Sequence, residues 1–283
     1  MASTKKVLLW GCLGCGGFLA LLIVLALGGV GFFAYQAVQF GTEIAKEYTT
    51  LTQNYEQLDQ EIAFTPPENQ LFTDERLKEY FVVRSSAVKF AEQYGDTFGK
   101  MGDEIGQTFD KGGVSSKISG AGKIGEIIKQ AAMMPATIGN EHLKLLREAQ
   151  MSPDEYVWFT REVLGVLLKA KDNEFEAGQT MWDNYIPAFE KARDHIKGMN
   201  INTGQFQIDG NDIQLDSLLG KVNDVTFIQE NAELIAQNTD QFVMEGNATI
   251  LDYMALHLKE ILADFSQKHD GPQAPQEVAP QAQ

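Results

Sequence analysis

The chain of 283 residues carries 23 lysines and arginines against 39 aspartates and glutamates, which gives a formal net charge of −16. This acidity repels nucleic acid and anionic lipid headgroups, so a general affinity for either is excluded. Both cysteines, Cys12 and Cys15, lie in an apolar run near the N-terminus. The rest of the chain therefore has no thiol for a disulfide or a nucleophile, but it is long enough for one domain with a substantial apolar core.

Residues 7–35 form an uncharged and strongly apolar segment, which predicts a transmembrane helix. Its apolar part would measure about 42 Å as a helix against a hydrocarbon core of about 30 Å, so we expect it to tilt or to reach the headgroups. Lys5 and Lys6 precede the segment, and this positive bias places residues 1–6 in the cytoplasm. The segment then acts as a signal-anchor, and the bulk of the chain lies outside the cytoplasm.

Two alternatives concern this anchor. A cleaved signal peptide is less favoured, because the apolar stretch exceeds a usual signal core and bulky residues occupy the candidate cleavage sites. Cys12, Gly16 and Ala20 recur at every fourth position, a spacing of small residues that lets two membrane helices approach closely. A homodimer through this face is therefore an alternative to a monomer.

Residues 36–65 predict a helix that continues the membrane span outward as a stalk. Apolar residues recur at steps of four and three from Ile44 to Ile62, and Pro66 and Pro67 stop the pattern. The seam is rich in tyrosine and shorter than three heptads, which is poor for an independent coiled coil. Packing of this face on the chain's own domain is favoured over a coiled-coil dimer.

A second long helix is predicted to begin after Thr73, which is placed to cap it, with Phe72 and Leu77 as a hydrophobic staple. Four glycines fall on one face of this helix: Gly95, Gly99, Gly102 and Gly106. Together they would cost a helix about 4 kcal/mol relative to alanine. The two explanations are a groove against which another helix packs closely, which we favour, and a mobile or broken helix.

Two later helix starts are marked by capping boxes. Ser152 is followed by Glu155 three residues later, the strongest start signal in the chain, and Thr226 is followed in the same way by Gln229. Between them, residues near 205–215 alternate apolar and polar side chains, which indicates a small β-hairpin.

The fold class expected from these patterns is all-α. We expect a transmembrane helix, a stalk helix and an irregular helical bundle over residues 66–265, followed by a disordered tail over 266–283 that is rich in proline and glutamine.

No motif in the sequence specifies a chemistry. Gly120, Gly122 and Gly125 match the glycine pattern of dinucleotide-binding loops, but no strand precedes them, so a dinucleotide site is not supported. The residues nearest to a metal site are His257, Glu260 and Asp264, which would share one face of the last helix. A solvated polar face is the favoured explanation of these three residues. We expect no cofactor.

The leading interpretation of function is a noncatalytic interaction or scaffold protein of the cell envelope. Residues 7–35 would hold it in the bilayer, and the helical domain would meet an unidentified protein partner. The alternative is an enzyme or metal-binding protein whose site is assembled from scattered residues: Asp194, His195, His257, Glu260 and Asp264. A sensor is disfavoured, because the residues before the span are too few to pass on a signal.

Overall fold

The structure is a computed structural model that describes residues 30–110, 133, 136–196, 200–202, 207–209, 213–242 and 246–260. Its long helices are α2 (Val30–Glu61), α3 (Asp74–Asp110), α5 (Pro153–Leu168) and α6 (Glu176–Ile196). The shorter elements are a helix over 136–148, α7 (Leu215–Val222), α8 (Gln229–Gln237), a 3-10 turn η2 (Thr239–Gln241) and α9 (Gly246–Leu256). The described part is a helical bundle, as the sequence predicts.

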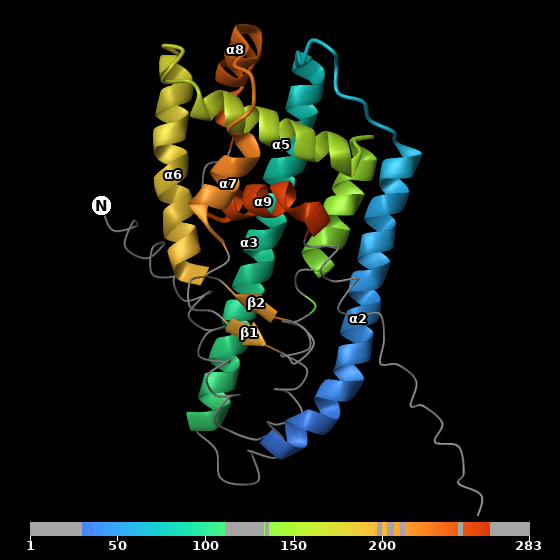
Figure 1. Ribbon diagram of the computed structural model, residues 1–283. Helices are drawn as coiled ribbons and strands as arrows, with labels where there is room; N and C mark the ends of the chain where they lie inside the picture. The colour runs from blue at the N-terminus through green and yellow to red at the C-terminus, as the bar shows by residue number, and fades with distance from the viewer. Residues whose placement is uncertain are drawn as a thin grey trace, which may run out of the picture.

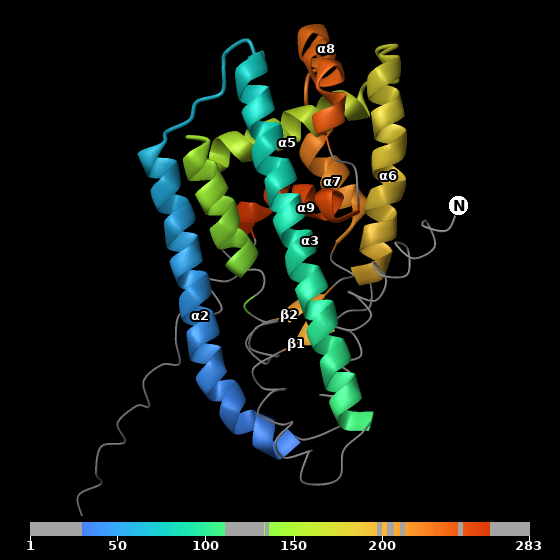
Figure 2. The same ribbon diagram turned by 180° about the vertical axis from the view of Figure 1, so that it is seen from behind.

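Two directions of helix make up the bundle (Figures 1 and 2). Helices α2, α3 and α6 run lengthwise, whereas α5 crosses them near one end and α9 crosses at mid-height. Because α5 contacts α2, α3, α6, α7, α8 and α9, it is the central helix of the domain. At the opposite end, α2 and α3 extend beyond the other helices.

The predicted transmembrane segment, residues 7–35, falls almost wholly outside the described residues. Only its last positions, 30–35, are described, and they form the first turns of α2. Within the described ranges, no helix combines the length and apolarity needed to cross a membrane. The dimer face of Cys12, Gly16 and Ala20 and the tail over 266–283 also lie outside these ranges.

Helix α2 packs its apolar face on the chain's own domain. It runs without interruption from Val30 to Glu61 and ends before the two prolines. Its buried face consists of Tyr48, Leu51, Tyr55 and Leu58, each at most 5% exposed. Gly139 allows the helix over 136–148 to lie close against this face, because a Cβ there would come within 2.8 Å of the side chain of Leu51. This part of the heptad-like seam therefore belongs to the core and is not free for a coiled coil.

The predicted start of α3 is confirmed. The Thr73 hydroxyl accepts a hydrogen bond from the backbone N–H of Arg76 at 3.3 Å, and Phe72 and Leu77 are both buried. The helix continues unbroken to Asp110 through the four glycines at 95, 99, 102 and 106. A broken helix at the glycine row is therefore excluded.

The start of α5 also follows its local signal. The Ser152 hydroxyl accepts from the backbone N–H of Glu155 at 3.0 Å, and Pro153 occupies the first turn. The helix is buried on most of its circumference, as expected for a helix surrounded by others. Gly165 permits one such close approach, since a Cβ at this position would lie 2.4 Å from Cβ of Val225.

The β-hairpin forms, but it lies earlier than predicted. Strands β1 (Asn200–Asn202) and β2 (Gln207–Asp209) pair antiparallel, with Ile201 opposite Ile208. Of the second half of the predicted range, the structure describes residues 213–215, which are not in a strand, and Leu215 begins α7. There the helical spacing of Leu215, Leu218 and Val222 places two fully buried side chains in the core, which outweighs the local alternation.

The predicted cap of α8 is wrong. The helix begins at Gln229 after Ile228, and no side chain in the described part of the chain caps it. Tertiary contacts position this region instead, because the side-chain amide of Asn231 forms two hydrogen bonds with the backbone of the segment before α3. Its oxygen accepts from the backbone N–H of Phe72 and its nitrogen donates to the carbonyl of Gln70, both at 2.8 Å.

Candidate functional site

The metal candidates at the end of the last helix have other partners. The His257 ring donates from Nδ1 to the carbonyl of Tyr253 and accepts at Nε2 from the hydroxyl of Ser217, both at 2.8 Å. The ammonium of Lys221 pairs with Glu260 and lowers the pKa of that carboxyl. Asp264 lies outside the described residues. The three-residue metal site therefore stays a prediction.

The other scattered candidates are not brought together by the described residues. The carboxylate of Asp194, near the end of α6, pairs with the neighbouring Arg193 at 2.9 Å and is exposed. The side chain of His195 lies outside what the structure describes. Across the described ranges, no group of three or more histidine, cysteine, aspartate or glutamate side chains could hold a metal ion.

The strongest polar feature of the domain is an ion pair at its centre. Arg84 of α3 donates from Nε and Nη2 to the two carboxylate oxygens of Asp252 of α9, at 2.7 Å each. Both side chains are only 1% exposed. The Arg84 guanidinium also lies 4.2 Å from the ring centre of Phe242, and the Tyr185 hydroxyl donates to Asp252 at 3.2 Å. We call Arg84, Asp252, Tyr185 and Phe242 the buried centre.

Burial and neighbouring charge shift the pKa values of Arg84 and of the tyrosines around it. Burial alone would lower the pKa of Arg84, but the adjacent carboxylate of Asp252 outweighs it and raises that pKa. Burial also raises the pKa of Tyr80, Tyr156 and Tyr185 well above the usual tyrosine value, so all three stay neutral. The ion pair of Arg84 and Asp252 therefore lies among neutral tyrosine hydroxyls.

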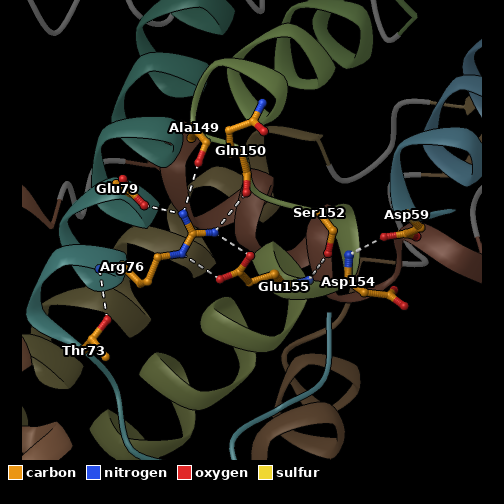
Figure 3. A network of polar contacts seen from close by, with 9 residues as sticks. All are labelled: Asp59, Thr73, Arg76, Glu79, Ala149, Gln150, Ser152, Asp154 and Glu155. Carbon is orange, nitrogen blue, oxygen red and sulfur yellow. Dashed lines mark hydrogen bonds and ion pairs between the residues drawn. The ribbon is translucent and has the colours of Figure 1, made fainter. Parts of the chain in front are cut away.

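A second network joins the helices around the start of α5 (Figure 3). Arg76 of α3 donates to both carboxylate oxygens of Glu155, at 2.9 and 2.5 Å, and to the carbonyls of Ala149 and Gln150, at 3.1 and 3.3 Å. It also pairs with Glu79. We call Arg76 and these partners the α5 junction. Glu155 thus binds a tertiary partner, so its side chain does not complete the capping box that the sequence suggests.

The α5 junction holds a strained turn and extends to α2. Gln150 has a φ of 49°, in the left-handed region that residues other than glycine rarely adopt. Arg76 donates hydrogen bonds to the carbonyls on both sides of the Gln150 Cα, those of Ala149 and Gln150. On the other side of the helix start, the Asp59 carboxylate of α2 accepts from the backbone N–H of Asp154 at 2.9 Å. Asp154 in turn pairs with Lys259 at 2.7 Å. Three segments distant in sequence therefore meet at the start of α5.

Comparison of the chain with protein-family models, with curated proteins and with solved structures finds no match. The inference of function therefore rests on the residues themselves.

A shallow, open cleft of about 240 Å³ lies between α2 and the helix over 136–148. Its lining residues are Asn54, Asn140, Leu143, Lys144 and Arg147. The two cations are already engaged, Lys144 with Glu141 at 3.0 Å and Arg147 with Glu61 at 3.6 Å. The rest of the lining consists of two asparagine side chains and one leucine, so the surface of the cleft is mostly polar.

Sequence reasoning did not single out Arg84 and Asp252, although a signal for each was present. Arg84 falls at the helical spacing of the buried stripe of α3, between Phe81 and Val88. Asp252 falls in the same way between Ala248 and Ala255 on α9. A charge in the middle of an apolar stripe indicates that an opposite charge lies opposite it in the fold.

Proposed function

We propose that the chain is a single-pass membrane protein that carries a noncatalytic helical scaffold domain outside the cytoplasm, where it binds a protein partner of the cell envelope. The observation that carries this proposal is the continuity of α2. The described part of the helix includes residues 30–35 of the predicted span and is still the same helix where its face enters the core at Tyr48. An anchor at residues 7–35 would therefore be joined to the domain without a flexible linker.

This geometry would hold the domain at a fixed height. From Tyr35 at the end of the predicted span to Tyr48, thirteen residues of helix extend about 20 Å. Helices α5 and α8 then lie at the end of the bundle far from α2's first residues, whereas the last turns of α3 reach the level of those residues (Figure 1). Such a placement suits a protein that presents a surface to partners at a set distance from the membrane.

The noncatalytic part of the proposal is supported by what the charged groups do. In both the buried centre and the α5 junction, arginine and carboxylate side chains bind each other across helices. Groups used in this way hold the bundle together and are not free to act on a substrate. The negative net charge favours a partner surface with complementary basic residues over nucleic acid.

The topology is tested by labelling in intact cells. Cys12 and Cys15 are replaced by serine, and a single cysteine is then introduced by Gln57→Cys on the exposed side of α2 or by Ser3→Cys before the span. A maleimide that cannot cross membranes should label the Gln57→Cys protein in intact cells and the Ser3→Cys protein only after lysis. The reverse pattern would refute the proposed orientation. Loss of the first three dozen residues in the intact mass would refute the anchor.

The scaffold role is tested separately by cross-linking the full-length protein in its native membrane and identifying attached proteins by mass spectrometry. We expect one reproducible envelope protein at stoichiometric yield. Its yield should fall when exposed acidic residues of α8, Glu230 and Glu233, are changed to lysine. Recovery of the chain alone, or a stoichiometric transition metal in the purified protein, would overturn the scaffold proposal.

A further inference from the structure

His142 occupies the joint between α2 and the rest of the domain. It lies on the helix over 136–148, and its Nδ1 is 2.9 Å from the hydroxyl of Tyr55 on α2. On its other side, the ring meets that of Tyr156 on α5 edge-on, with centroids 4.5 Å apart. One imidazole thus connects three helices, and α2 is the helix that leads toward the predicted membrane span.

The hydrogen bonds around the ring favour one tautomer. The Tyr55 hydroxyl lies 3.3 Å from the carbonyl oxygen of Gly139. A carbonyl oxygen can only accept, so the hydroxyl is the donor in this hydrogen bond. It then accepts from an Nδ1–H of His142, which leaves Nε2 without a proton. That Nε2 is buried and has no hydrogen-bond partner among the described residues. An unprotonated Nε2 without a donor costs little in this position. Protonation of Nε2 would create a buried, charged N–H that has no hydrogen-bond acceptor.

We propose that His142 is an acid-sensitive latch: the uncharged ring holds α2 against the helix over 136–148 and α5, and protonation of Nε2 in acid releases α2 from this joint. The proposal rests on the described packing and does not depend on the membrane anchor or on a partner.

Among the described residues, the surroundings of the ring offer no charge that would stabilise its protonated form. Tyr55 and Tyr156 remain neutral, because burial raises the pKa of both. The charged groups along the same seam bind elsewhere: Glu47 to Asn140, Asp59 to the N–H of Asp154, Glu61 to Arg147 and Glu141 to Lys144. Burial therefore lowers the pKa of His142 to about 4, from an ordinary value of 6.5.

The direction of the pH effect follows from this difference. A released His142 takes up a proton near pH 6.5, whereas the latched ring resists until about pH 4. The latch is therefore complete above pH 6.5 and weakens as the pH falls from there toward 4. Over that interval, the equilibrium between latched and released α2 shifts by about a hundredfold.

Hydrogen exchange of the full-length protein in detergent micelles tests the latch. Protection factors, corrected for the intrinsic pH dependence of exchange, are compared at pH 7 and pH 4. In the wild type we expect protection of α2 amides over 48–58 to fall about a hundredfold, while amides of α6 stay protected. In His142→Phe, which keeps an aromatic ring but cannot titrate, the fall should be less than tenfold.

Two matched variants separate the latch from general acid sensitivity. Tyr55→Phe removes the hydroxyl that joins the His142 ring to α2, so protection of amides 48–58 should already be lower at pH 7 than in the wild type. His257→Gln removes a histidine that lies outside the joint and should show the wild-type fall at pH 4. An equal fall in wild type and His142→Phe would overturn the proposal. If His142→Phe does not fold at pH 7, the His142 ring of the wild type is titrated by NMR, and a midpoint near 6.5 without loss of α2 protection would overturn it.

Discussion

The buried centre and the α5 junction use the same chemistry at different depths. Each pairs an arginine of α3 with a carboxylate through two hydrogen bonds. At the centre, Arg84 and Asp252 are 1% exposed, whereas Arg76 and Glu155 at the junction are 28% and 10% exposed. Water can therefore replace a lost partner at the junction but not at the centre. Removal of one partner should therefore cost much more at the centre than at the junction.

The largest effect is expected from Asp252→Ala. This change leaves the Arg84 guanidinium buried without its counter-charge, and we expect the free energy of unfolding to fall by about 3–5 kcal/mol. Urea unfolding of the full-length protein followed by far-UV circular dichroism measures it. The double variant Arg84→Met with Asp252→Leu removes both charges and should recover most of that loss. If the double variant is as unstable as the single one, the cost comes from lost packing and not from an uncompensated charge.

Two helical glycines, the buried Gly165 and the exposed Gly220, allow the effect of an added methyl group to be compared in the core and at the surface. Gly165→Ala places a Cβ 2.4 Å from Cβ of Val225, so we expect a loss of about 1–3 kcal/mol, partly restored by adding Val225→Ala. Gly220→Ala, on α7, meets no atom within 4 Å and should raise stability by about 0.5–1 kcal/mol. Thermal unfolding of both variants checks the contrast, and a stabilising Gly165→Ala would show that α5 has more room than its contacts indicate.

At the α5 junction, Arg76→Ala should cost only about 1–2 kcal/mol, because the Glu79 side chain is 38% exposed and removal of the Arg76 side chain opens the Glu155 carboxylate to solvent. Arg76→Lys keeps the charge but cannot form the paired bonds to Glu155, so its loss should lie between those of the wild type and the alanine variant. Urea midpoints of the two variants measure this order. A loss as large as that of Asp252→Ala would mean that the junction is as dry as the centre.

The elements that could be predicted from the sequence are those with local signals. The starts of α3 and α5 were predicted because Thr73 and Ser152 carry their caps within the same few residues. The buried face of α2 was predicted because its spacing repeats over several turns. Such signals require no knowledge of what lies opposite in the fold.

The errors occur where distant contacts decide the structure. The apparent cap at Thr226 is not used, because α8 is positioned by the amide of Asn231 on a segment about 160 residues earlier in the chain. Glu155 likewise binds Arg76, 79 residues away, and not the start of its own helix. Arg84 and Asp252 lie 168 residues apart in the chain. The sequence shows a charge within each apolar stripe, but it does not show that the two charges pair.

The smallest effect is expected from Lys78→Ala, the control that completes the comparison. Lys78 pairs with Asp74 one turn earlier on α3 at 2.6 Å, a distance shorter than either bond of the buried centre, yet both side chains are about half exposed. If separation alone set the value of an ion pair, this variant would be as damaging as Asp252→Ala. Because water and salt already screen both charges, we expect its urea midpoint to match that of the wild type within error. A measurable loss that disappears in high salt would show that screening at this end of α3 is weaker than its exposure implies, and depth would then not be sufficient to rank the ion pairs of this domain.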